Sequence, residues 1–480
     1  MTDHVDVLIV GAGLSGIGAA ASLTREHPEQ SYAILEARGA SGGTWDLFRY
    51  PGVRSDSDMY TLGYRFKPWR GSKSLADGPS ILAYVRETAR EYGIDRQIRY
   101  DHRVTAADWD SETARWTVTA RHGDADVQVT CRLLWVCSGY YDYDAGYTPH
   151  FEGVERFQGR VVHPQAWPED LDYAGQRVVV IGSGATAVTL VPAMAERAAH
   201  VTMLQRTPTY ILSVPGTDPI DSRVKKLLPA RAAYGFSRWK NVLVSTGLYQ
   251  LSQRRPAVVK KLLRKGQEKA LPAGYDVARH FSPPYDPWDQ RLCLVPDGDL
   301  FEALSRGDAE IVTDTIETFT ERGILLASGR ELEADVIVTA TGLALKPFGG
   351  AALRVDGAEV KLPETMAYKA LMLSGVPNMV FTVGYTNASW TLKADLVADF
   401  VSRLLTYLDE HGYRSVVARR DPSVAEAPFM DFEAGYVLRA LDRLPKQGDR
   451  APWRLKQNYL YDIRAIRHGD LEDGVLSYSR

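Results

Sequence analysis

Two apolar segments of this sequence each run directly into a glycine-rich loop, and this repeated pattern restricts the possible fold more than any other feature. Val5–Val10 is followed by G-A-G-L-S-G at Gly11–Gly16, and Gln176–Ile181 is followed by G-S-G-A-T-A at Gly182–Ala187. A glycine-rich turn between a buried parallel strand and a helix directs backbone amides at a pyrophosphate. The pattern therefore predicts an α/β chain with two Rossmann-like dinucleotide-binding domains.

The strand that returns after each loop ends in residues of different charge. Ser31–Glu36 ends in an acid that can accept hydrogen bonds from an unphosphorylated ribose, which favours FAD or NAD in the first unit. His200–Thr207 instead carries Gln205 and Arg206, and a guanidinium can bind a 2′-phosphate through two hydrogen bonds. The second unit is therefore predicted to prefer NADP. The alternative, that Arg206 merely solvates a strand end, stays open.

The glycines of the first loop have separate predicted roles. Gly11 permits a tight turn, Gly13 lets the backbone approach the pyrophosphate, and Gly16 lets the helix pack close to the strand. The predicted contacts of the two loops are Gly11, Gly13, Ser15 and Gly16 in the first, and Ser183, Gly184, Ala185, Thr186, Ala187, Arg206 and Thr207 in the second.

Length, charge and cysteines exclude several classes of protein. A chain of 480 residues predicts several domains, and a net charge of -3 argues against a nucleic-acid partner. Cys131, Cys137 and Cys293 form no C-x-x-C pair, which weakens a disulfide-reductase interpretation. Cys131 and Cys137 lie in an apolar run, at the end of a predicted β-meander over 106–136, so we expect them in the core. We interpret the apolar start of the chain as a buried strand and helix of a cytoplasmic protein.

Two longer patterns lie beside the glycine loops. Phe157–Pro168 reads F-x-G-x-x-x-H-x-x-x-W-P, and Gly42–Asp56 reads G-G-x-W-x-x-x-x-Y-P-G-x-x-x-D. Both resemble the fingerprints of type I Baeyer–Villiger monooxygenases, which are class B flavin-containing monooxygenases. The segment Leu444–Trp453 also resembles the subgroup that contains the ethionamide-activating monooxygenase. For His163 within the first pattern, the resemblance implies a structural or domain-coupling role and no proton transfer.

The resemblance implies FAD in the first unit and NADPH in the second. It implies that Asp56 lies beside the reactive flavin ring and that Arg291, its expected ion-pair partner, stabilises anions during catalysis. The alternatives are a turn-capping carboxylate and a structural salt bridge. Gln290 stands where many family members have a basic residue, which leaves strictness for NADPH open. The further cofactor contacts implied by the resemblance are Gly43, Thr44, Trp45, Leu47, Arg54, Ser55, Asp56 and, through its backbone, Val104.

The same resemblance divides the chain into alternating segments. We expect the FAD-binding domain at 1–147 and 376–480, the NADP-binding domain at 148–211 and 288–375, including a linker, and a helical insert at 212–287. The insert is rich in Lys and Arg over Ile220–Leu271. A basic amphipathic helix there is either a solvated lid or a weak membrane-surface contact.

The implied activity is an NADPH- and O2-dependent oxygenation. Oxygen would be inserted next to a ketone carbonyl through a C4a-peroxyflavin, giving an ester or lactone. One alternative is oxygenation of sulfur or nitrogen on the same scaffold, because a fold does not determine a reaction. Another is a flavin reductase or nucleotide sensor that transfers no oxygen. The expected partners are a small ketone or sulfide and O2, without nucleic acid or metal, whereas the particular substrate and the oligomeric state are not predicted.

Overall fold

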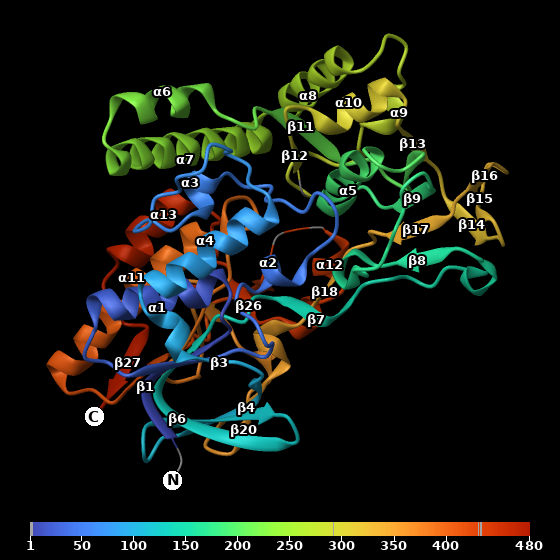
Figure 1. Ribbon diagram of the computed structural model, residues 1–480. Coiled ribbons are helices and arrows are strands. Elements are labelled where there is room, and N and C mark those ends of the chain that lie inside the picture. Colours follow the sequence, from blue (N-terminus) through green and yellow to red (C-terminus); the bar gives the residue numbers. More distant parts are fainter. Residues whose placement is uncertain (1–2, 291, 431, 433) are drawn as a thin grey trace.

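The computed structural model describes residues 3–290, 292–430, 432 and 434–480. A mixed sheet forms the centre of the first nucleotide-binding unit (Figure 1). Its strands, in order across the sheet, are β20 (Ala358–Glu359), β19 (Ala352–Val355), β4 (Arg103–Asp110), β5 (Arg115–His122), β6 (Ala125–Val136), β1 (Asp3–Val10), β2 (Tyr32–Leu35) and β3 (Ile98–Arg99), and β23 (Met379–Phe381) also pairs with β6. Strand β6 is parallel to β1 and β23, whereas β4, β5 and β6 form the expected antiparallel meander.

Both faces of this sheet are covered, which explains why β1 is apolar at successive positions. Val7 and Ile9 pack on one face, among residues of α1 (Leu14–Glu26), α4 (Gly78–Glu91) and α11 (Trp390–His411). Leu8 packs on the opposite face, in a core that also contains Cys131. Cys131 and Cys137 are 0 % and 4 % exposed, which confirms their predicted place in the core.

A second, wholly parallel sheet forms the other nucleotide-binding unit. Its order is β13 (Ala309–Thr313), β10 (His200–Gln205), β9 (Arg177–Ile181), β17 (Val336–Thr339) and β8 (Arg160–Val162). Helices α5 (Ala185–Ala195) and α10 (Asp299–Arg306) pack together beside it. An antiparallel extension consists of β14 (Ile316–Phe319), β15 (Gly323–Leu326) and β16 (Glu331–Glu333). The two units confirm the predicted α/β architecture.

The insert is helical, as expected. It contains α6 (Pro219–Leu227), α7 (Ala230–Arg254), α8 (Pro256–Ala270) and α9 (Val277–His280). The parallel strands β11 (Tyr210–Val214) and β12 (Leu292–Pro296) carry the chain into and out of it. Figure 1 shows α6 and α7 side by side above α3 (Met59–Leu62), which α7 contacts. Within the described residues, no helix combines the length and the apolarity needed to cross a bilayer.

The chain passes twice between the two units, along the antiparallel strands β7 (Tyr141–Gly146) and β18 (Leu343–Leu345). We expected the return to the first unit at 376, but β19 already pairs with β4, so the chain rejoins the first sheet by residue 352.

The shorter elements are α2 (Thr44–Leu47), β21 (Ala367–Tyr368), β22 (Met372–Leu373), β24 (Ser415–Ala418), β25 (Glu426–Pro428), α12 (Gly435–Leu438), β26 (Lys446–Gly448), α13 (Tyr459–Asp462) and β27 (Leu476–Ser479).

Candidate functional site

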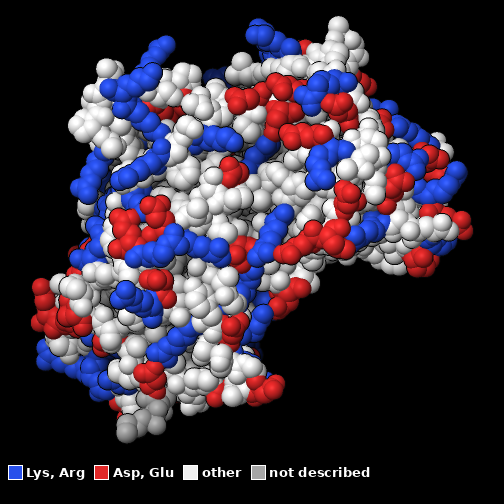
Figure 2. Space-filling view, in the orientation of Figure 1, with Lys and Arg blue, Asp and Glu red and all other residues white. Residues whose placement is uncertain are grey.

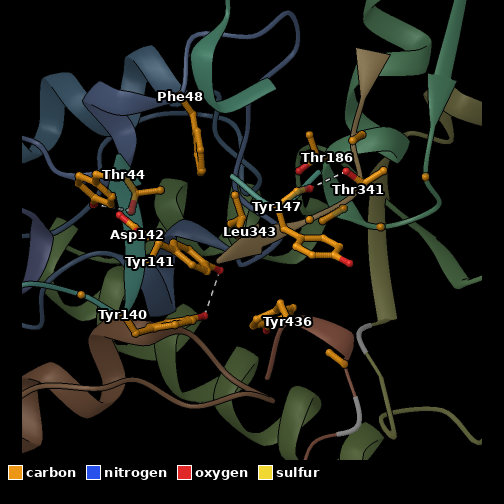
Figure 3. Close-up of a pocket in the computed structure, with 18 of the residues that line it drawn as sticks. Thr44, Phe48, Tyr140, Tyr141, Asp142, Tyr147, Thr186, Thr341, Leu343 and Tyr436 are labelled. Carbon is orange, nitrogen blue, oxygen red and sulfur yellow. Dashed lines mark hydrogen bonds between the residues drawn. The ribbon is translucent and has the colours of Figure 1, made fainter. Parts of the chain in front are cut away.

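A single cavity of about 1310 Å³ is lined by both glycine loops. It extends from Gly11 and Gly13 in the first unit to Ser183, Gly184 and Thr186 in the second. Figure 3 shows its middle part, where side chains from both units point into the same space. Two loops that were separate predictions in the sequence therefore face one shared cleft.

The first loop has the geometry that a nucleotide cradle requires. Gly11 has φ +101°, and a Cβ there would lie 2.7 Å from the carbonyl oxygen of Cys137. At Gly16 a Cβ would lie 1.8 Å from the carbonyl oxygen of Gly11, which is the close helix–strand approach predicted for that position. Helix α1 follows Gly13 without a side-chain cap, so its first amides remain available to an anion.

Glu36 lies at the end of β2, where it holds the first loop. Its Oε2 accepts a hydrogen bond from the backbone N–H of Ala12 at 2.7 Å, and its Oε1 accepts one from that of Arg38 at 3.0 Å. Burial raises the pKa of Glu36, and both N–H donors oppose that shift. The carboxylate lines the cavity and has further lone pairs for a ribose hydroxyl.

The G-G-x-W segment forms one wall of the cleft. Gly43, Thr44 and Trp45 line it, and the hydroxyls of Thr44 and Tyr143 are hydrogen-bonded at 3.0 Å. The structure differs from expectation at Leu47, which is not among the lining residues, whereas Phe48 is. Leu47 is the last residue of α2, whereas Phe48 follows the helix with an extended backbone, so the two side chains leave the chain in different directions.

The Y-P-G-x-R-S-D segment connects the two units. Burial raises the pKa of Tyr50 to about 12, and the side chain of Thr186 in the second loop opposes that rise. Arg54 forms a two-contact ion pair with Asp299 at the start of α10. Ser55 and Asp56 line the cavity. Arg291 lies outside the described residues, so its pairing with Asp56 stays a prediction.

The second loop repeats the geometry of the first. Gly182 has φ +136°, and a Cβ there would lie 2.4 Å from the carbonyl oxygen of Ala340. Gly184 precedes α5, which has no side-chain cap, and no described atom lies within 4 Å of its potential Cβ. Ser183 donates to the carbonyl oxygen of Thr207 at 2.8 Å, and Ala185 and Thr186 line the cleft. Ala187 does not line it, because it is 0 % exposed in the core beneath.

Gln205 and Arg206 have different surroundings at the predicted ribose position. The Gln205 amide is buried, where its Nε2 donates to the carbonyl oxygen of His280 and to Oγ1 of Thr313, both at 2.9 Å. Arg206 is exposed and lines the cavity beside Thr207. Among the described residues, the Arg206 guanidinium is therefore placed at the cavity edge where the ribose phosphate is predicted to bind.

His163, in the F-x-G-x-x-x-H-x-x-x-W-P segment, contacts the loop Ala340–Gly342 that follows β17. Its Nδ1 accepts a hydrogen bond from the backbone N–H of Gln165 at 3.2 Å, and its Nε2 lies 3.2 Å from the carbonyl oxygen of Gly342. A neutral ring with the proton on Nε2 satisfies both contacts. Burial lowers the pKa of His163, which favours the same neutral form. These contacts fit a structural role at the junction of the units.

An aromatic wall closes the cleft on the side of the first unit. Trp390 stacks on Tyr140 with ring centroids 5.1 Å apart, and its Nε1 donates to Ser15 Oγ at 2.7 Å. Arg439 lies over the ring of Tyr147, 3.5 Å from its centroid. No local sequence pattern identified Trp390 or Arg439 as lining residues. The backbone-contact prediction at Val104 is compatible with the structure, because Val104 lines the same cavity.

Comparison with known proteins gives consistent matches along the whole chain. A flavin-binding monooxygenase-like model matches residues 75–372, and an NAD(P)-binding Rossmann-like domain model matches residues 9–69. The chain is 58 % identical to FAD-containing monooxygenase EthA of Mycobacterium tuberculosis, with 100 % of this chain and 99 % of the relative covered. It is 51 % identical to the putative FAD-containing monooxygenase MymA of the same organism, with 100 % and 98 % covered.

A solved structure of oxidized steroid monooxygenase bound to NADP has the same fold. It gives a TM-score of 0.78 at 24 % identity and covers 99 % of this chain and 100 % of its own. The matches confirm both the architecture and the resemblance to class B flavin-containing monooxygenases. The chain belongs to the flavin-binding monooxygenase-like family.

Proposed function

We propose that this protein is an FAD- and NADPH-dependent monooxygenase that inserts one oxygen atom beside a ketone carbonyl, giving an ester or a lactone. The observation that carries the proposal is the continuous cavity lined by two glycine loops with different charge at the ribose position. Glu36 suits an unphosphorylated ribose on one side, and Arg206 suits a phosphorylated one on the other. The similar proteins EthA and MymA are described as FAD-containing monooxygenases, which agrees with the first assignment.

The residues present fit both cofactors. When bound, FAD supplies the redox chemistry, because it takes a hydride from NADPH and activates O2. Three features of the first unit fit FAD: the uncapped start of α1, the acid Glu36 at the ribose position and the flat ring of Trp45. The proposed FAD contacts are Gly11, Gly13, Ser15, Glu36, Gly43, Thr44, Trp45, Ser55, Asp56 and Val104, whereas the predicted contact Gly16 is buried and does not line the cavity. The proposed NADPH contacts are Arg54, Ser183, Gly184, Ala185, Thr186, Arg206 and Thr207.

The protein contributes position, charge and exclusion of water. We assign to Arg291 the stabilisation of negative charge that develops on the oxygenated substrate, since a guanidinium is a permanent cation. Asp56 would orient that guanidinium. The rings of Tyr147 and Tyr436 point into the cleft in Figure 3 and offer apolar contacts to a small organic substrate.

The decisive experiment is mass spectrometry of products formed from a ketone and a thioether under ¹⁸O2, with purified FAD-loaded enzyme and NADPH. We expect an ester or lactone that carries one labelled oxygen. Sulfoxide as the sole product would instead support heteroatom oxygenation. NADPH oxidation without any oxygenated product would support a reductase.

Arg291→Ala tests the proposed catalytic cation. Removal of a group that stabilises a developing anion reduces kcat by roughly 100- to 1000-fold, so we expect that loss in lactone formation with FAD content unchanged. A variant with full lactone formation would contradict the assignment. Arg291→Lys is the matched control, because it keeps the charge and loses the two-pronged geometry.

A further inference from the structure

Helix α7 carries large apolar side chains on its solvent side. Phe236, Trp239 and Leu243 follow the i, i+3, i+7 spacing of one helical face and are 48, 48 and 57 % exposed. Leu227 and Leu228, at the end of α6, are 80 and 44 % exposed. Because α6 packs against α7, we treat these five residues as one surface, the apolar stripe. Larger exposed apolar patches mark sites of interaction with a protein or a membrane.

Basic residues stand at both ends of the apolar stripe. The segment 219–267 contains twelve Lys and Arg residues and one acid, Asp221, whose carboxylate is paired with Lys240 at 2.7 Å. In Figure 2 the edge of the molecule over α6 and α7 is mostly blue and white. Nine of these bases are exposed: Arg223, Lys225, Lys226 and Arg231 near the start of α7, and Arg254, Arg255, Lys261, Arg264 and Lys265 near its end and along α8.

We propose that this surface docks on a lipid bilayer that carries anionic headgroups. A helix that lies in the plane of a membrane interface presents apolar side chains to the acyl boundary and Lys or Arg to the headgroups, which is the arrangement found here. Trp239 is a side-chain type enriched at that depth. A second copy of the chain is a poorer occupant, because it would bring the two sets of basic residues together. The docking is peripheral and independent of the reaction proposed above.

Vesicle sedimentation tests the proposal with the FAD-loaded protein. One set of vesicles contains phosphatidylcholine alone, and the other contains equal parts of phosphatidylcholine and phosphatidylglycerol. We expect binding to the anionic set that is at least roughly tenfold stronger than to the neutral set, and that weakens as salt screens the charges. Equal binding to both sets, or no binding to either, would overturn the proposal.

Matched variants distinguish binding through this surface from binding that depends only on the net charge of the protein. Arg223→Gln with Lys226→Gln and Arg231→Gln should lower anionic-vesicle binding at least roughly fivefold. The equal-charge control Arg96→Gln with Arg419→Gln and Arg443→Gln changes exposed bases outside the insert and should bind as the parent does. If both triple variants lost binding equally, net charge would explain it and the docking surface would be refuted.

Substitutions in the apolar stripe provide an independent measurement. Phe236→Ser with Leu243→Ser should weaken binding, whereas Val161→Ser, at a 40 % exposed site outside the insert, should not. Brominated anionic lipids should quench the parent protein more than Trp239→Leu. FAD content and NADPH oxidation should match the parent in each variant. If the double variant instead altered the oligomeric state without lipid and left vesicle binding intact, the stripe would be a self-association surface and the proposal would fall.

Discussion

Glu36 Oε2 lies 2.7 Å from the backbone nitrogen of Ala12, so a buried carboxylate at the end of β2 holds the glycine loop that follows β1. A second N–H, from Arg38, reaches the other carboxylate oxygen. The same side chain that is proposed to bind the ribose therefore also fixes the shape of the pyrophosphate cradle.

This double role makes Glu36→Ala more harmful than the loss of one ligand contact. Buried N–H groups that lose their acceptor cost roughly 1–3 kcal/mol each, so we expect a lower Tm together with release of FAD. Glu36→Gln keeps an acceptor oxygen for Ala12 and should retain more FAD. Flavin absorbance after gel filtration and a thermal melt measure the two effects. Equal FAD content in both variants and the parent would contradict the assignment.

His163 predicts a stability loss on the acid side of neutrality. Its folded-state pKa is lowered from 6.5 by burial, so below pH 6.5 the unfolded chain takes up a proton that the folded chain does not. The free energy of unfolding should therefore fall as the pH drops from 6.5 to the folded pKa, and above pH 6.5 this residue should have no effect on it. His163→Gln removes the titration and can keep both hydrogen bonds. Melts of parent and variant at a series of pH values should diverge only in that acid window; parallel curves would show that His163 does not contribute.

Local rules made both nucleotide units predictable, because each depends on consecutive residues. Gly11 and Gly182 have backbone angles that favour glycine, and the apolar strands before them are buried on both faces. The contacts between distant segments were not predictable in this way. Arg54 and Asp299 are 245 positions apart, and Ser15 and Trp390 are 375 apart.

The directions of individual side chains could not be predicted from the sequence either. The sequence put Gln205 and Arg206 together at the ribose position, but tertiary hydrogen bonds turn Gln205 into the interior. It also implied Leu47 along the flavin, where the structure has Phe48. Which of two neighbouring side chains lines the cavity depends on how the short helix α2 packs against the rest of the unit, and the local sequence does not determine that packing.

Arg206 should determine the preference for the phosphorylated nucleotide. A charge-assisted hydrogen bond contributes roughly 1.5–3 kcal/mol, equivalent to about 10- to 100-fold in affinity. Arg206→Gln should raise KM for NADPH by that factor and leave KM for NADH within about twofold. Arg206→Lys should have a KM for NADPH between those of the parent and of Arg206→Gln. Steady-state kinetics with both nucleotides tests this, and a parallel rise in both KM values would show that Arg206 does not read the phosphate.

The Arg54–Asp299 ion pair should link the flavin-side loop to the second unit. The side chains are 13 and 31 % exposed, so the pair is only partly screened by water. In a double-mutant cycle of Arg54→Gln and Asp299→Asn, we expect a coupling of roughly 1 kcal/mol in unfolding free energy. Asp299→Asn alone should also raise KM for NADPH, since Arg54 loses the group that positions it. Strictly additive destabilisation by the two substitutions would rule out the coupling.

Substitutions at Gly182 and Gly184 should have different effects, the first on stability and the second on nucleotide binding. Gly182→Ala forces a side chain into φ +136° and against the Ala340 carbonyl, so it should destabilise the protein by roughly 1–3 kcal/mol or more. Gly184→Ala meets no described atom within 4 Å and has an ordinary extended backbone, so Tm should be unchanged. Its methyl group would nevertheless stand where the pyrophosphate is proposed to approach, and the loss of one such contact predicts a KM for NADPH roughly 10-fold higher or more. A Gly184→Ala enzyme with parental Tm and parental KM would mean that the pyrophosphate does not lie against this loop, and the assignment of the second unit to NADPH would have to be abandoned.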